Sequence, residues 1–295
     1  MNLLFLTFGD NIKNHYQANF AILSFLKGKA GISNIYVFTD HPQYYAHYQE
    51  HVQAVAVTEA QLQEWKGPYD FFWRVKIKAI EEVMLKHTDT PLVYLDADTF
   101  LYGDITMLKD PLARGEALMH VQEGPLSQLK SKTEQKMWSQ VKGLRVGETE
   151  IGAGHAMWNA GVVAIPAAQN TAAVALALHL CDTMCQRNVT RRLIEQFSLS
   201  VALAETYPMQ PANAFIGHYW GNKEQWSEEI SRFFLESHLK AYSVAQDIER
   251  IRHFDFKRFA MIRRIKKTRQ RLTKAIDTLF PPKETLFLGG SEESR

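Results

Sequence analysis

The chain has 295 residues, of which 46% are hydrophobic and 12% aromatic, enough for one large globular domain with or without an appendage. The longest apolar runs are far too short to span a bilayer, and the N-terminus lacks the basic segment and cleavage site of a signal peptide. A formal net charge of only +2 excludes a uniformly basic nucleic-acid-binding protein, and we expect no nucleic acid among the partners.

Strands alternate with helices in the first third of the chain. We expect buried strands at 2–10, 32–40, 54–58 and 92–95. We expect helices after the first strand, where Tyr16, Phe20 and Leu23 recur at helical spacing, and at 71–87. This order predicts an α/β fold with a Rossmann-like, mostly parallel sheet flanked by helices. Ligands of such sheets bind outside the carboxyl ends of the strands.

The pattern beyond Gly103 is mixed. We expect strands at 117–122 and 158–166, helices at 127–141, 168–187 and 190–206, and a loop at 211–226. Cys181 and Cys185 lie four residues apart in one of these helices, where a disulfide is unfavourable. We therefore expect reduced thiols and a cytoplasmic protein.

Positive charge is concentrated near the C-terminus. Residues 255–280 carry a net charge of +7, whereas residues 1–254 carry −4. We expect a globular domain at 1–254 and a tail at 255–295 that begins with a basic amphipathic helix. Such a helix can lie on an anionic membrane, bind nucleic acid or pack as an ordinary terminal helix. Phe256 and Phe259 among the charges favour peripheral contact with the inner face of the membrane.

Two carboxylates, Asp96 and Asp98, follow the strand at 92–95 in the segment LVYLDADTF. A tight turn here would let one reach a metal directly while the other acts directly or through water. Mg²⁺ and Mn²⁺ prefer carboxylate oxygens and usually complete their shells with substrate phosphates. A turn-capping Asp with an incidental neighbour is the alternative. Asp10 and Asp40 also follow predicted strands, which favours one shared cleft.

A phosphatase uses a similar pattern, Asp-x-Asp-x-Thr/Val, in which the first Asp accepts a phosphoryl group. Here the fifth position is Phe100, and the segment lies a third of the way along the chain instead of opening it. Both features disfavour a dehalogenase-like phosphatase.

A second polar segment, IGHYWGNK at 216–223, contains His218, Gly221 and Lys223. Neutral imidazole is a good ligand for Mn²⁺-like metals beside carboxylates. Gly221 would let the backbone approach a ligand, and Lys223 offers a point charge to phosphate. A surface loop whose aromatic residues pack on the core is the alternative.

The motifs LDADTF, WNAGVVAIP, EQFSL and GHYWGNKEQW occur in the order found in the glycogenin-like, family 8 glycosyltransferases, which have a GT-A fold. The chain resembles that family over about residues 2–226, including TFGDNIKNHYQANF in the first strand and helix. The resemblance implies a nucleotide-sugar-dependent hexosyltransferase. Its expected donor is UDP-linked, and its acceptor is a glycan or lipid-linked saccharide.

The resemblance also implies roles for individual residues. Mn²⁺ or Mg²⁺ would be bound by Asp96, Asp98 and His218. The catalytic candidates are Gln196 beneath the anomeric carbon, Asn159 at a sugar hydroxyl, and Glu195 as a further carboxylate. The candidates for donor binding are Thr7, Phe8, Asn11, Tyr16, Lys78, Asp96, Gly161, Gly221 and Lys223. Gln196 is a poor nucleophile, so a retaining enzyme could use a same-face displacement as well as a covalent intermediate.

Some positions depart from the family pattern. Lys223 follows Gly221 by two residues instead of three, the Pro after the lysine is absent, and the helix pair is Glu195-Gln196 instead of Asp-Gln. A catalytically inactive nucleotide- or saccharide-binding protein is therefore the alternative to an enzyme. Arg74 and Lys78, four residues apart on one helix, are candidates for the phosphates or for a solvated helix face.

Overall fold

The computed structural model describes residues 1–263, 268, 272, 275, 276 and 278–280. The chain divides into two compact units, residues 1–261 and 262–295. In the second unit, the described residues 268, 272, 275, 276, 278 and 279 are helical, and the N–H of Phe280 donates to the carbonyl of Ile276 at 2.8 Å. Residues 264–267, 269–271, 273, 274 and 277 of the predicted basic helix lie outside the described residues.

In the described part of the first unit, seven strands form the central sheet in the order β12-β6-β11-β4-β1-β2-β3. Neighbours pair in parallel except at β11, which runs antiparallel to β4 and to β6. Their bounds are β1 (Asn2–Thr7), β2 (Asn34–Thr39), β3 (Gln53–Ala56), β4 (Leu92–Leu95), β6 (Ala117–Met119), β11 (Val162–Ile165) and β12 (Met209–Pro211).

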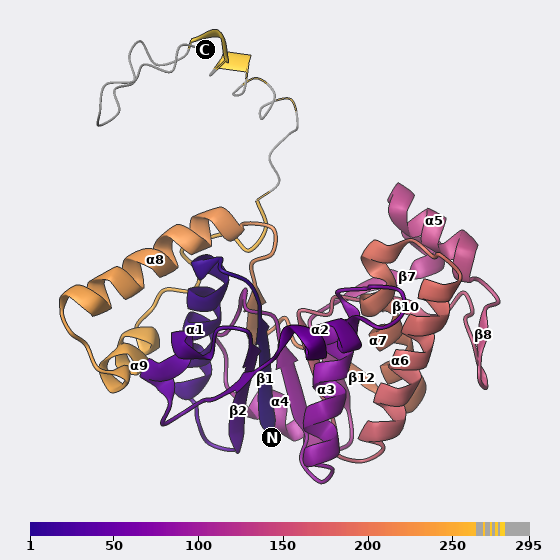
Figure 1. Cartoon of the computed structure of the whole chain (residues 1–295), viewed down its shortest axis with the longest axis horizontal. Helices are drawn as coiled ribbons and strands as arrows, with labels where there is room; N and C mark the ends of the chain where they lie inside the picture. Colours follow the sequence, from indigo (N-terminus) through magenta and orange to yellow (C-terminus); the bar gives the residue numbers. More distant parts are fainter. Residues whose placement is uncertain (264–267, 269–271, 273–274, 277, 281–295) are drawn as a thin grey trace. The chain divides into compact units, whose positions relative to one another are not determined.

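Helices cover both faces of this sheet (Figure 1). One face packs against α1 (Ile12–Leu26), α4 (Thr106–Ala113), α8 (Lys223–Leu239) and α9 (Val244–Arg252). The other packs against α2 (Glu59–Lys66), α3 (Arg74–Lys86), α5 (Lys132–Val141), α6 (Asn170–Gln186) and α7 (Ile194–Thr206).

The strand sequences explain why both faces are covered. In β1, Leu3 and Phe5 belong to the core on the α1 side, while Leu4 belongs to the core on the α3 side. Because successive side chains of a strand point to opposite faces, a continuous apolar run must be buried on both. The short strands of LVYL and VVAI follow the same rule, so the expected α/β sheet is confirmed.

A small ribbon outside the main sheet positions the polar residues. Strand β5 (Thr99–Leu101) pairs antiparallel with β13 (Ile216–His218), which places His218 opposite Thr99 and Gly217 opposite Phe100. A Cβ on Gly217 would lie 2.4 Å from the Phe100 ring, so only glycine lets the ring lie over this strand. The ribbon therefore brings residue 218 beside residue 98 across more than a hundred residues of chain.

Phe100 is part of a buried aromatic cluster. Its ring centroid lies 4.8 Å from that of Trp226 and 4.6 Å from that of Phe256. Trp226 is fully buried, and its indole N–H donates to the carbonyl of Ala260 at 3.1 Å. The start of α8 and the segment after α9 are thus attached to the ribbon.

Several expected elements have different limits in the structure. Residues 117–122 divide into β6 and β7 (Gln122–Pro125), the latter paired with β10 (Ala156–Trp158). The helix expected from residue 127 begins at Lys132 after its capping Ser131, with a 3₁₀ turn, η2 (Leu126–Gln128), before it. The expected loop at 211–226 contains β13 and the start of α8. The many small and polar residues of this segment gave no periodic apolar pattern from which these elements could be predicted.

The remaining short elements are η1 (Pro42–Tyr48), η3 (Arg191–Leu193), β8 (Arg145–Val146) and β9 (Thr149–Glu150).

The predicted tail helix does not begin at Asp255. Residues 255–261 belong to the first unit and form turns, and Phe256 and Phe259 pack against the core of the α1 side. These two rings contact Phe100 and Trp226 respectively. They are therefore part of the packed body and do not support a membrane-facing helix. No helix in the described part of the chain combines the length and apolar character needed to cross a bilayer.

The aromatic cluster gives a stability prediction. Trp226→Ala should lower the free energy of unfolding by about 3–5 kcal/mol, since it removes a fully buried indole and leaves a cavity. Trp220→Ala, only six residues away but 47% exposed, should change it by less than about 0.5 kcal/mol. Urea denaturation measures both, and equal losses would contradict the assigned role of the cluster.

Candidate metal and nucleotide site

Asp96 and Asp98 lie in a tight turn between β4 and β5. The N–H of Asp96 donates to the carbonyl of Gly161 at 2.9 Å, and the N–H of Thr99 donates back to the carbonyl of Asp96 at 3.1 Å. The Thr99 hydroxyl also donates to that carbonyl, at 2.8 Å. This turn follows β4 directly, at the carboxyl end of a central strand.

The turn brings both carboxylates to His218. One oxygen or nitrogen atom from each of Asp96, Asp98 and His218 lies within 4.8 Å of the others. His218 Nε2 is 3.4 Å from Asp98 Oδ1 and 3.9 Å from Asp96 Oδ2. The side chains of Asp98 and His218 are each 5% exposed, whereas that of Asp96 is 29% exposed. The three predicted metal ligands therefore converge in the structure.

Asn159 orients the imidazole of His218. Asn159 Oδ1 is 3.0 Å from His218 Nδ1 and also accepts the N–H of Gly161 at 3.1 Å. An amide oxygen only accepts, so Nδ1 carries a proton and Nε2 faces the two carboxylates. An unprotonated imidazole nitrogen and two carboxylates are all acceptors. They repel one another unless a proton or a cation lies between them. The donor set fits a Mn²⁺- or Mg²⁺-like ion.

Gly161 makes room for His218. A Cβ at this position would lie 2.2 Å from the imidazole carbon Cε1. The sequence resemblance predicts Gly161 in the wall of the donor site, and the structure adds that the missing side chain is needed for the histidine itself.

Lys223, the first residue of α8, is the second cation at Asp98. Its Nζ lies 2.8 Å from Asp98 Oδ2, and its side chain is 57% exposed. Burial alone would raise the pKa of Asp98, but the hydrogen bond and charge of His218, and then Lys223, hold it well below its usual range. Lys223 thus lies with the predicted ligands despite its irregular spacing from Gly221, which lies two residues before the start of α8.

A cavity of about 460 Å³ opens beside these groups. Its lining includes the charged side chains of Asp96, Asp98, Lys76 and Lys223. The aromatic rings of Phe8, Phe72 and Trp73 also line it, as does Thr7. The cavity lies outside the carboxyl ends of β1 and β4, where parallel sheets bind ligands.

Other predicted site residues have different surroundings. Asn11 caps α1, where its side chain accepts the N–H of Lys13. The Tyr16 hydroxyl bonds to Ser227 and Ser231 of α8. Neither lines the cavity. Gln196 of α7 donates its amide N–H to Glu123 at 3.1 Å.

Solved structures with this arrangement of elements include the galactosyltransferase LgtC in complex with donor and acceptor sugar analogues. It is 14% identical, with a TM-score of 0.51 over 79% of this chain and 94% of that chain. An active-site mutant of LgtC is 12% identical with a TM-score of 0.50, at the same coverages of 79% and 94%. Mouse xyloside xylosyltransferase 1 in its apo form is 13% identical over 72% of this chain and 85% of that chain, with a TM-score of 0.47.

The chain has the GT-A glycosyltransferase fold. At these identities the likeness is one of fold. No protein-family model matches the chain, and no curated protein matches it in sequence.

Within this GT-A fold, Lys76 is the residue that the sequence analysis missed. Its Nζ lies 3.2 Å from Asp96 Oδ1 and 3.0 Å from Glu195 Oε1, and it donates to the carbonyl of Ala160 at 3.1 Å. Burial alone would lower the pKa of Lys76, but the charges of Asp96 and Glu195 outweigh it and raise the pKa. The buried ammonium therefore joins α3, β4 and α7 beneath the cavity.

Lys78 does not reach the carboxylates. Residues two apart on a helix point in nearly opposite directions, so Lys78 leaves α3 on the side away from Lys76 and pairs with Glu81. Arg74 forms a two-pronged pair with Asp182 of α6, at 2.6 and 3.0 Å. The helix periodicity of α3 contains this distinction, since Lys76 lies four residues before Ile80 and seven before Val83, both of which are buried.

Two further polar groups are buried at the site. Burial raises the pKa of Glu195, a shift that Lys76 only partly offsets. The ring of His120 lies edge-on to that of His218, with centroids 5.1 Å apart. Burial, followed by the charge of His218, lowers the pKa of His120 to about 4. His120 therefore stays neutral beside the predicted ligand at neutral pH.

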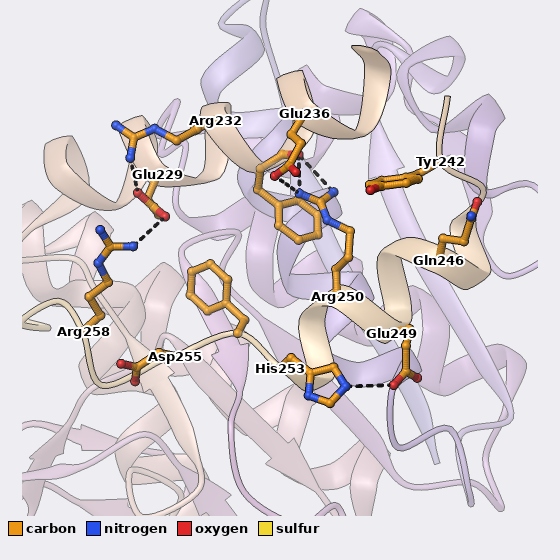
Figure 2. Close-up of a pocket in the computed structure, with 12 residues that line it drawn as sticks. Glu229, Arg232, Glu236, Tyr242, Gln246, Glu249, Arg250, His253, Asp255 and Arg258 are labelled. Atoms are coloured by element: carbon orange, nitrogen blue, oxygen red, sulfur yellow. Dashed lines mark hydrogen bonds and ion pairs between the residues drawn. The ribbon is translucent and has the colours of Figure 1, made fainter. Parts of the chain in front are cut away.

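A larger cavity, of about 680 Å³, lies between α8 and α9 and is shown in Figure 2. Most of its charged side chains are paired with one another: Arg250 with Glu236, Glu229 with Arg232 and Arg258, and His253 with Glu249 (Figure 2). No group of three metal-ligating side chains occurs there among the described residues. Size alone therefore does not identify the site.

The position of Lys76 gives a second stability prediction. Lys76→Met should lower the free energy of unfolding by about 3–5 kcal/mol, because Glu195 and Asp96 would lose the ammonium between them. Lys78→Met, on the same helix, removes only a partly exposed pair and should cost less than about 1 kcal/mol. Urea denaturation compares the two, and a tolerated Lys76→Met would show that this buried pairing is dispensable.

Proposed function

We propose that the chain is a metal-dependent, retaining glycosyltransferase that moves a hexose from a nucleotide sugar, with UDP as the expected nucleotide, to a saccharide. The observation that carries the proposal is the convergence of Asp96, Asp98 and His218 beside Lys223, at a cavity in a GT-A fold. Carboxylate and imidazole ligands next to a largely exposed lysine suit a metal-bound diphosphate.

Each site residue has a separate proposed role in binding the metal or the phosphates. A Mn²⁺ or Mg²⁺ ion held by Asp96, Asp98 and His218 would supply a Lewis acid for the departing diphosphate. Asn159 keeps Nε2 of His218 toward the ion position, and Tyr94 and Lys76 hold Asp96 Oδ1, leaving Oδ2 toward His218. Lys223, more than half exposed, can turn from Asp98 to a phosphate oxygen.

Gln196 is the proposed residue beneath the sugar, and Glu195 is a neighbouring carboxylate. The hydrogen bond to Glu123 fixes the amide nitrogen of Gln196, so its oxygen is the atom available to an anomeric carbon. Because an amide is a poor nucleophile, we favour a same-face displacement in which the departing diphosphate assists the acceptor. Glu195 is nearly fully buried against Lys76, so its role is to hold that lysine and the α3–α7 contact.

The alternatives account for less of the site. A phosphatase would need Asp96 as a nucleophile, yet its Oδ1 accepts from Tyr94 at 2.6 Å and lies 3.2 Å from Lys76. An inactive binding protein has no need for three converging ligands and an oriented histidine. We also propose a glycan or lipid-linked saccharide as the acceptor, a cytoplasmic location, and contact of the basic tail residues with the membrane, to which the packed Phe256 and Phe259 do not contribute.

Metal-dependent nucleotide binding is the first functional prediction. UDP with Mn²⁺ at about 100 times its Kd should stabilise the folded chain by about 2.7 kcal/mol, a rise in melting temperature of several degrees. UDP with a chelator, and Mn²⁺ alone, should give much smaller shifts. Thermal-shift measurements with a panel of nucleotides make the test, and the absence of any response to nucleoside diphosphates would argue against the proposal.

Turnover should depend on Asp98. Asp98→Asn keeps the shape of the side chain but removes the charge of a buried ligand, so kcat/KM for donor hydrolysis or transfer should fall by at least about 10³. Asp104→Asn, the same change at an exposed residue six positions on, should leave kcat/KM within about twofold because it alters only a turn before α4. Near-normal turnover of Asp98→Asn across UDP-sugars would refute the metal assignment.

A further inference from the structure

Two large aromatic side chains are exposed at the mouth of the cavity. Phe72 is 43% and Trp73 53% exposed, although most aromatic residues of the described chain are buried. Both line the cavity that contains Asp96 and Asp98. Two adjacent exposed rings form an apolar patch beside charged side chains, and such patches often mark a surface that a ligand covers.

The rings are held in place before any ligand binds. Trp73 stacks on the buried Phe71, with centroids 6.3 Å apart and planes at 18°. Phe72 meets Phe8 edge-on at 6.3 Å and Trp73 edge-on at 5.4 Å. The exposed faces therefore belong to a packed aromatic group and not to freely rotating side chains.

The backbone connects this group to the carboxylates. The N–H groups of Arg74, Val75 and Lys76 donate to the carbonyls of the three preceding aromatic residues at 2.9–3.2 Å, which forms the first turn of α3. Lys76 ends that turn and binds Asp96. One helical turn thus fixes the aromatic group relative to the metal ligands.

The cavity consequently suits a ligand with one strongly anionic part and one flat apolar part. A nucleoside diphosphate has both, with its diphosphate matched to Lys223 and its base to the rings. Tyr16, expected near the base, does not line this cavity, and its hydroxyl is bonded to Ser227 and Ser231 of α8. The exposed aromatic rings that do line the cavity are those of Phe72 and Trp73.

We propose that Phe72 and Trp73 form the platform on which the nucleobase stacks. This inference rests on the proposed function, since it requires a nucleotide in the cavity. Stacking on an aromatic ring accepts any base because every base has a π-face. The platform therefore contributes affinity, and the choice among bases depends on other groups.

The test is calorimetric titration of the full chain with UDP and with inorganic pyrophosphate, both in the presence of Mn²⁺. Trp73→Ala and Phe72→Ala should each weaken UDP binding by about 5- to 150-fold and leave pyrophosphate binding within about twofold. Trp73→Phe should retain most of the UDP affinity, since it keeps an aromatic face. Tyr102→Ala, 38% exposed and outside the cavity, is the control and should bind both probes like the wild type.

The outcomes separate this inference from the proposed function. Wild-type binding of UDP that neither alanine variant weakens would overturn the platform alone. Loss of UDP and pyrophosphate binding to the same extent would also overturn it, because the defect would then concern the diphosphate end. An unchanged UDP affinity with a raised KM for the acceptor would assign the rings to the acceptor saccharide instead. No binding of any nucleoside diphosphate by the wild type would overturn both proposals.

Discussion

Burying negative charge is the constraint on which this structure depends. Asp98 and Glu195 are nearly inaccessible to water, and Asp96 is only partly exposed. Carboxylates in such surroundings persist only with cations or hydrogen-bond donors next to them. Lys76 lies between Asp96 and Glu195, while Lys223 and His218 flank Asp98. The elements that carry these partners, α3, α7, β13 and α8, are therefore joined through the carboxylates as well as through the apolar cores.

Close backbone approach is the second requirement of the same arrangement. His218 reaches Asp98 because β13 pairs with β5, and that pairing leaves room for the Phe100 ring only over Gly217. The imidazole in turn occupies the space where a side chain at residue 161 would stand. Asn159 Oδ1 accepts from both the N–H of Gly161 and the imidazole of His218. One amide oxygen therefore fixes the position of the backbone at Gly161 and the orientation of the histidine. Phe100, which the sequence analysis used only to disfavour a phosphatase, anchors this ribbon to Trp226.

The parts of the site that were predictable from sequence are those whose signal is local. Asp96 and Asp98 follow an apolar strand, and the strand and the two carboxylates are recognisable within the seven residues 92–98. His218 and Lys223 were found through ordered motifs, and the structure brings them to the same carboxylates. Lys76 was missed because its importance lies in Glu195 and Asp96, which are remote in sequence. Lys78 was preferred although two residues along a helix reverse the direction of a side chain. The helices α8 and α9 were not predicted, since their apolar positions are interrupted by many charged residues that pair with each other.

The two lysines at the site differ in how far they can move. In the described structure, Lys223 approaches the same carboxylate that a metal would need, and only its ammonium end has to move because its side chain is largely exposed. Lys76 cannot leave in the same way, since it is buried and bonded to three acceptors. The fixed lysine keeps Asp96 oriented, whereas under the proposed function the exposed lysine would exchange Asp98 for phosphate oxygens when a metal-bound diphosphate binds. An incoming metal-diphosphate complex would then replace one ion pair with others, without leaving Asp98 as an unpaired buried charge.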